Sequence, residues 1–271
     1  MDFLKRSLAP ITDAAWAEIA REAKDAFRLN LSARSIVDVT EPRGLDFSAV
    51  NLGRLEMPNR QKRDSAVRHG VRKVLPLVEA RASFELGVWE LDNMDRGARD
   101  PDLAPLHSAA RELAKFEEEA VYQGLAEAGI TGLMDSSSFE PIAVKPTASA
   151  LPEAVERAVL RLRYAEVDGP YALALGAAYH TILQTGVVSG YPIRNRVREL
   201  IEGPVVLAPF LTGGVVVSRR GGDTELTLGQ DISIGYETHD TSTVRLFFSE
   251  SFTFRVLAPE AVVPLHAVAK G

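Results

Sequence analysis

The sequence contains no cysteine among its 271 residues. Disulfides, zinc–thiolate sites, iron–sulfur clusters and cysteine nucleophiles are therefore excluded. This absence fits a reducing compartment, and we expect a cytoplasmic protein. The N-terminus lacks the long apolar core of a signal peptide. Nowhere does a run of about 18 apolar residues occur, so we expect no membrane partner.

Motifs that carry chemistry are also missing. The five histidines include no pair three or four residues apart, and no glutamate precedes a histidine by three positions, so the di-iron bundle signature is absent. The patterns GxxxxGK[ST], GxGxxG and GxSxG, which mark phosphate loops and serine nucleophiles, do not occur. We therefore expect no catalytic residue, no metal and no required cofactor, and we do not interpret the chain as an enzyme.

The net charge of -6 argues against a nucleic-acid coat, which would need a basic face. A basic cluster between residues 60 and 73 stands out within a stretch, 42–75, that sustains no helical period. It has no interleaved aromatics for base stacking, so we favour a charged loop that pairs with acidic neighbours over nucleic-acid binding. The cluster consists of Arg60, Lys62, Arg63, Arg68, Arg72 and Lys73.

The unpatterned length of 42–75 is typical of a functional loop, a disordered segment or an extended hairpin. An extended arm that finds its partner on another subunit would have the same pattern. The alternatives stay open at this point.

Apolar spacing and end signals predict several helices. The first begins near Thr12 or Asp13, and the longest runs from Pro101 to about 128, with Gly129 as its stop. Its run Glu117–Glu118–Glu119 cannot converge on one site, because consecutive helical residues point about 100° apart, and we interpret it as a solvated face. Further helices are expected over 151–165, 177–184 and 193–202, and the first helix buries Trp16, Ile19, Ala23, Phe27 and Leu31.

Strands are predicted at both ends of the chain, with helices between them, so the expected class is α+β. In the last strand, Phe252, Phe254 and Val256 alternate with polar residues, which indicates one buried face. The expected strands cover 35–41, 76–91, 171–175, 205–210, 213–220, 224–230, 231–237, 243–248 and 251–257.

Several blocks of the sequence are more specific than its composition. They are MDFLKRSLAPITDAAWAEI, LPLVEARASFEL with VWELDNMDRG, GPYALAL, SGYPIRNRV and RRGGDTELTLGQDISIGYETHDTSTVRLFFSESFTFRVL. These blocks resemble family 1 encapsulins, bacterial nanocompartment shell proteins once called linocin-type bacteriocins. They follow the order of the family and cover nearly the whole chain, and the most specific part is GGDTELTLGQDISIGY.

The resemblance implies the tailed-phage major capsid fold and a chain that assembles into a hollow icosahedral shell. It implies an N-terminal cargo-binding helix and first strand over 1–41, an extended loop over 42–75, and a peripheral domain with a spine helix over 76–130. The axial domain would cover 131–225, and C-terminal strands of the peripheral domain would cover 226–271.

The resemblance also implies partners: further copies of the chain, and a cargo enzyme that docks through its C-terminal targeting peptide. The cargo would be a ferritin-like iron oxidase or a dye-decolorising peroxidase, for iron storage or oxidative-stress defence. The matching cargo-binding positions are Phe27, Arg34, Val37, Asp38, Asp231, Ile232 and Ile234. Plain core packing of Phe27 and Val37 is the alternative.

Two further sites follow from the resemblance. Trp89 and Tyr191 match positions where some members carry flavin, with aromatic packing as the alternative. The second site is the five-fold pore, which would be lined by Thr185, Gly186, Val187, Val188, Ser189 and Gly190.

Rival interpretations of the whole chain are a phage or prophage major capsid protein and a flavin-binding oxidoreductase.

Overall fold

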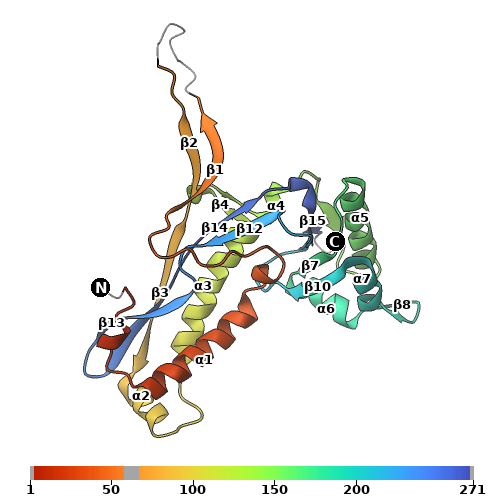
Figure 1. The fold of residues 1–271 in the computed structure, drawn as a ribbon. Coiled ribbons are helices and arrows are strands. Elements are labelled where there is room, and N and C mark those ends of the chain that lie inside the picture. Colours follow the sequence, from red (N-terminus) through yellow and green to blue (C-terminus); the bar gives the residue numbers. More distant parts are fainter. Residues whose placement is uncertain (1–2, 58–66, 269–271) are drawn as a thin grey trace.

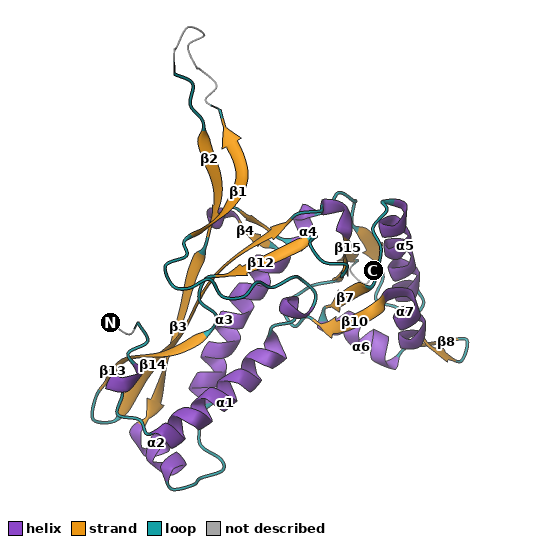
Figure 2. Ribbon diagram, in the orientation of Figure 1, coloured by secondary structure: helices purple, strands orange, loops and turns teal. Residues whose placement is uncertain are grey.

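The computed structural model describes residues 3–57 and 67–268. An elongated body, made of a long sheet and its helices, carries a projecting hairpin at one end and a rounded α/β unit on one side (Figure 1). Figure 2 shows the long sheet and the sheet of the rounded unit with their helices. In the described residues no helix is long and apolar enough to cross a membrane.

Helix α1 (Asp13–Asn30) begins where the sequence predicts. The Oγ1 atom of Thr12 accepts a hydrogen bond from Ala15 N (3.2 Å), as an N-cap does. The predicted apolar face is buried at Trp16, Ile19 and Phe27, in one core with α3 and the long sheet. The helix therefore lies against the body.

Helix α3 (Ala104–Tyr122) is shorter at both ends than predicted. It begins after Asp102, whose carboxylate accepts from Ala104 N (3.0 Å), so Pro101 lies outside it. It ends before Gly124, which has a φ of +97°. The chain then reverses through β4 (Gly124–Leu125), η3 (Ala126–Ala128) and β5 (Ile130–Thr131), and Gly129 closes η3, not the long helix.

Strand β14 (Thr243–Val256) is the central strand of the long sheet. It pairs with β3 (Val78–Gly87) on one side, and with β13 (Ser233–His239) and β12 (Thr224–Leu228) on the other. The two strands expected over 243–248 and 251–257 are thus one. The predicted single buried face is wrong as well, because Ser251 and Thr253 are buried along with the phenylalanines.

Two predicted strand segments differ in the structure. Residues 35–41 form no strand beyond one bridge between Val39 and Leu226. The 3₁₀ helix η2 (Ala33–Ser35) includes the first of them, and irregular backbone hydrogen bonds join the rest to β12. The strand predicted over 76–91 ends at Gly87, where its partner β14 begins, and α2 (Val88–Asp95) follows.

Strands β1 (Ala49–Glu56) and β2 (Val71–Pro76) pair antiparallel and form the projecting hairpin. Of the alternatives open for 42–75, the described residues show the extended hairpin. The predicted basic residues Arg60, Lys62 and Arg63 lie outside the described residues.

The rounded unit is built on a five-stranded sheet in the order β10-β7-β11-β15-β6. Strand β7 (Tyr171–Leu175) is buried along its whole length, as predicted. The other strands are β10 (Glu202–Leu207), β11 (Gly214–Ser218), β15 (Val262–Ala267) and β6 (Ile142–Val144). Its helices are α4 (Leu133–Ser136), α5 (Ala150–Tyr164), α6 (Ala177–Thr185) and α7 (Ile193–Ile201), the last three close to their predicted bounds.

Strands β6 and β15 were not predicted. We expected the whole of 226–271 in the peripheral domain, but β15 pairs with β11 and β6 in the sheet of the rounded unit. The reason is topological: the chain leaves β14, passes through η4 (Pro259–Ala261) and returns to the other sheet.

Candidate functional site

A groove lies between α1 and β13, with a volume of about 420 Å³. Its apolar lining includes Phe27 of α1 and Phe248 of β14. Ile232 and Ile234 come from the segment that enters and begins β13. Phe27 packs edge-on against Phe248, with ring centroids 5.0 Å apart. The predicted cargo-binding residues Phe27, Arg34, Asp231, Ile232 and Ile234 all line this one groove.

Val37 and Asp38, also predicted for this site, do not line the groove. Val37 is buried in a different core, which it shares with the strands of the rounded unit. The Oδ2 atom of Asp38 accepts from Gly222 N (2.7 Å), and its carbonyl accepts from Leu226 N (2.8 Å). Val37 and Asp38 therefore hold this segment of the chain beside β12, which is a structural role.

Arg34 connects the groove to a buried cluster of carboxylates. Its Nε atom donates to Glu117 Oε1 (2.8 Å) and its Nη1 atom to Asp231 Oδ1 (2.8 Å). Its Nη2 atom donates to Glu250 Oε2 (3.2 Å). Glu117 and Glu250 are fully buried, with 0% of each exposed. The side chain of Arg34, a predicted cargo-binding residue, is therefore fixed by three acidic groups of its own chain.

The interpretation of Glu117–Glu118–Glu119 as a solvated face is wrong for the first two residues. Glu118 is fully buried. It accepts from Ala33 N (2.7 Å) and from the hydroxyl of Ser32, which also contacts the Tyr122 hydroxyl (2.8 Å). Only Glu119 stays partly exposed. The helix turns the two acids toward η2 and β14, where polar partners replace water.

Burial raises the pKa of two carboxyl groups in this cluster, those of Glu118 and Glu250. It raises the pKa of Glu118 to about 7, against the opposing hydrogen bonds from Ser32 and Ala33. Burial, followed by the negative charge of Glu117, raises the pKa of Glu250 well above its usual range.

Sequence reasoning missed several residues of this site. Glu250 carried a visible signal, since it is the one acid in a strand otherwise rich in phenylalanine. Leu4 and Arg6, from the residues before α1, also line the groove. Arg6 lies over the ring of Trp16 at 4.3 Å. No local pattern distinguishes these two from an ordinary terminal segment.

The predicted pore residues form a small projection of the rounded unit. Strands β8 (Val187–Val188) and β9 (Tyr191–Pro192) pair as a hairpin beyond α6. Ser189 and Gly190 turn with positive φ, 52° and 81°, and Val187 is exposed. The residues predicted to line the five-fold pore thus lie at the start of and within a hairpin that projects from the rounded unit, away from the body (Figure 1).

The chain does not bring Trp89 and Tyr191 together. Trp89 lies on α2 with 75% of its surface exposed, and Tyr191 lies on β9 with 48% exposed. Helix α2 lies at the end of the body away from the β1–β2 hairpin, and the β8–β9 hairpin lies on the far side of the rounded unit (Figure 1). A site using both residues would need two copies of the chain.

Comparison with known proteins gives closely consistent results. The sequence profile described as "Encapsulating protein for peroxidase" matches residues 1–253. The type 1 encapsulin shell protein of Rhodospirillum rubrum is 43% identical, with 100% of this chain and 98% of that protein covered. The type 1 encapsulin shell protein of Mycobacterium tuberculosis is 38% identical, with 98% and 99% covered.

Solved structures with the same fold include the virus-like particle of Pyrococcus furiosus and the capsid of Myoviridae phage XM1. The former has a TM-score of 0.63 at 17% identity, covering 93% of this chain and 99% of that one. The latter has a TM-score of 0.56 at 12% identity, covering 89% and 92%. These likenesses confirm the α+β capsid fold that the sequence predicted.

Proposed function

This chain belongs to the encapsulin family of shell proteins, which assemble with copies of themselves, and we propose that its shell holds a cargo enzyme on the α1–β13 groove. The shell would be closed and icosahedral, because repeated self-complementary contacts close most simply under point-group symmetry. In this proposal the reactive groups belong to the enclosed enzyme, and the chain itself supplies the container.

The observation that carries the cargo proposal is the gathering of predicted residues in one groove. Ile232 offers partly exposed apolar surface, and the buried Phe27 and Ile234 form the apolar lining next to it. Asp231 and Arg34 offer a fixed polar pair beside this lining. Apolar contacts with a few placed polar groups are typical of a site that takes a peptide in one orientation. A C-terminal targeting peptide of a cargo protein fits this description.

For the cargo we propose a dye-decolorising peroxidase or a ferritin-like iron oxidase. The matched family's description names a peroxidase, which supports the first. A shell with such a cargo would serve oxidative-stress defence or iron storage. We place this shell in the bacterial cytoplasm, and fractionation of cells that make the protein would test that location.

We further propose that the β8–β9 hairpin lines the pore at the five-fold axis. Its exposed surface consists of uncharged residues such as Val187, Val188 and Ser189. Weak selectivity between cations and anions would follow, because no charged side chain in 185–190 would favour either sign. A bound flavin at Trp89 and Tyr191 would require two neighbouring copies, and a visible absorption spectrum of the purified shell would reveal it.

The test is purification of shells from cells that carry the native gene neighbourhood, followed by mass spectrometry of the contents. We expect one enzyme to copurify with the unmodified chain and to be lost with Ile232→Ser, which removes an apolar groove residue. Leu29→Ser is the matched control, because Leu29 is 72% exposed on α1, which forms one wall of the groove, and does not line the groove itself. Equal loading of all three shells would contradict the assignment. DNA in place of an enzyme would favour a phage capsid protein.

A further inference from the structure

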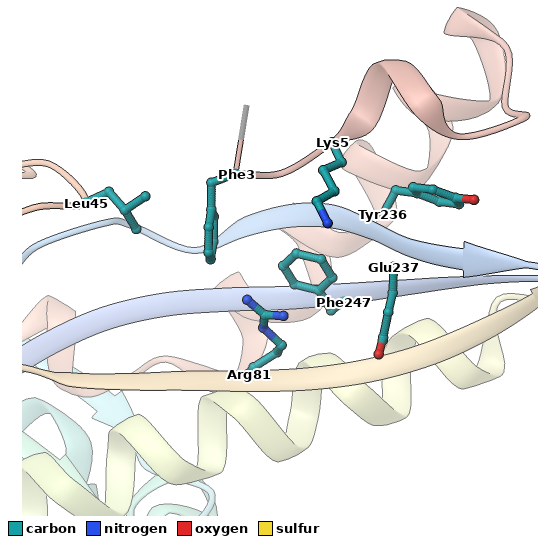
Figure 3. A pocket seen from close by; sticks show the side chains of 7 residues that line it. All are labelled: Phe3, Lys5, Leu45, Arg81, Tyr236, Glu237 and Phe247. Carbon is teal, nitrogen blue, oxygen red and sulfur yellow. The ribbon is translucent and has the colours of Figure 1, made fainter. Parts of the chain in front are cut away.

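The residues before α1 form an arm, residues 3–8, that separates two cavities. Phe3 and Lys5 line a cavity of about 390 Å³ on the outer face of the long sheet, with Arg81 and Phe247 (Figure 3). Leu4 and Arg6 line the α1–β13 groove on the other side. Phe3 and Leu4 lie in a turn, and the 3₁₀ helix η1 covers Arg6–Leu8, so neighbouring side chains of this folded segment line different cavities. The arm therefore lies between the two cavities.

The arm is fastened from the outer cavity. The ring of Phe3 meets the ring of Phe247 edge-on, with centroids 6.2 Å apart. The guanidinium of Arg81 lies 4.1 Å from the Phe247 ring and 5.3 Å from the Phe3 ring. On the edge of β13, Tyr236 N donates to Leu4 O (2.8 Å). The Phe3 side chain makes these ring contacts without lining the groove itself.

The hold on the arm is weak. None of residues 3–8 is buried. Lys5 has a φ of +49°, a left-handed conformation that costs energy in a residue other than glycine. Segments with few buried contacts open locally at little free-energy cost. Loss of one ring contact would therefore change how often the arm is in place.

We infer that Phe3 is a positioning residue for cargo binding: seated against Phe247 and Arg81, it holds Leu4 and Arg6 in the groove wall. Leu4 then completes the apolar lining formed by Phe27, Ile232 and Phe248. The bound partner is an extended peptide with apolar side chains. This inference rests on the proposed cargo-binding function of the groove.

The experiment disassembles the shells and reassembles them with a labelled glycine–serine peptide that carries two leucines, so that the peptide reaches the groove inside. Its binding is compared with that of the same peptide without leucine. The unmodified shell binds the leucine peptide more tightly. Phe3→Ala weakens that binding about fivefold, because the contacts of one aromatic ring are lost. Phe3→Tyr keeps the ring and restores the affinity. Leu45→Ala is the matched control, since Leu45 lines the outer cavity without belonging to the arm.

Hydrogen exchange at the Tyr236 amide gives a second readout that does not depend on peptide affinity. Phe3→Ala speeds exchange there, leaves the β14 amides unchanged and still permits shell assembly. Unchanged affinity and exchange in Phe3→Ala would overturn the inference, as would equal weakening by Leu45→Ala. If the unmodified shell does not distinguish the two peptides, the proposed function of the groove fails instead.

Discussion

At the scale of single residues, the groove depends on one guanidinium among three acids. Arg34 contacts Glu117, Asp231 and Glu250, and two of these acids are fully buried. A buried charge is costly unless a partner and hydrogen bonds replace its water. The cluster therefore fixes the groove's polar edge and makes the chain sensitive to loss of the arginine.

Arg34→Met should destabilise the fold by about 3–5 kcal/mol, because it leaves buried acids without their cation. Urea unfolding gives the measurement. Arg28→Met should change stability by less than about 1 kcal/mol, since Arg28 makes an exposed ion pair with Asp25. Equal effects of the two substitutions would contradict the account of the cluster.

Glu118 should make stability depend on pH. Its pKa is raised from an ordinary value of 4.5 to about 7, so the folded chain keeps a proton that the unfolded chain releases. The free energy of unfolding therefore falls as pH rises from 4.5 to 7, by up to about 3 kcal/mol from this group. Glu118→Gln stays neutral and should remove this slope. Glu119→Gln should keep the pH dependence of the free energy of unfolding. If Glu118→Gln kept it too, the assignment of this dependence to Glu118 would be wrong.

The family resemblance identified both apolar and charged residues of the groove, such as Ile232 and Arg34, but not the buried acids behind them. Ile232 could be named because it lies in the most specific block of the resemblance. Glu117 and Glu118 were misread because helical periodicity treats a glutamate as solvent-facing by default. Their burial depends on Arg34, Ser32 and Glu250, which are distant in sequence and become neighbours only in the fold.

At the scale of elements, local sequence patterns predicted a helix or strand correctly where the residues of that element alone determine where it begins and ends. Helix α1 with its Thr12 cap and the fully apolar β7 were predicted closely. The length of β14 and the existence of β6 and β15 depend on partners far along the chain. Pairing of that kind leaves little trace in a single segment.

Gly124 illustrates an end that sequence spacing does not reveal. A Cβ there would lie 2.7 Å from Ile130 O, at a φ of +97°. Gly53 on the hairpin also has a positive φ, but a Cβ there would meet nothing within 4 Å. Gly124→Ala should therefore cost at least about 1 kcal/mol more than Gly53→Ala in urea unfolding. Similar costs would contradict the close approach at α3's end.

At the scale of the whole molecule, the shape suits a subunit that contacts other copies of the chain. The β1–β2 hairpin projects from the body and exposes Leu55, Val71 and Val74 (Figure 1). Apolar side chains on an extended hairpin gain stability by pairing with a neighbouring subunit. Many such contacts, each modest, stabilise a closed particle together.

Val71→Asp should therefore block assembly while leaving the subunit folded, because it places a charge on the hairpin's exposed surface. Sedimentation velocity would show small species with an unchanged circular dichroism spectrum. Leu29→Asp, an equally exposed apolar site on α1, should still form large particles. Full-size particles from Val71→Asp would show that the hairpin does not contribute to closure.

Negative-stain electron microscopy of the chain expressed alone tests the central claim most directly. The account predicts uniform, hollow, spherical particles built from this one polypeptide. A population of small monodisperse oligomers, with no closed particles at high protein concentration, would contradict it.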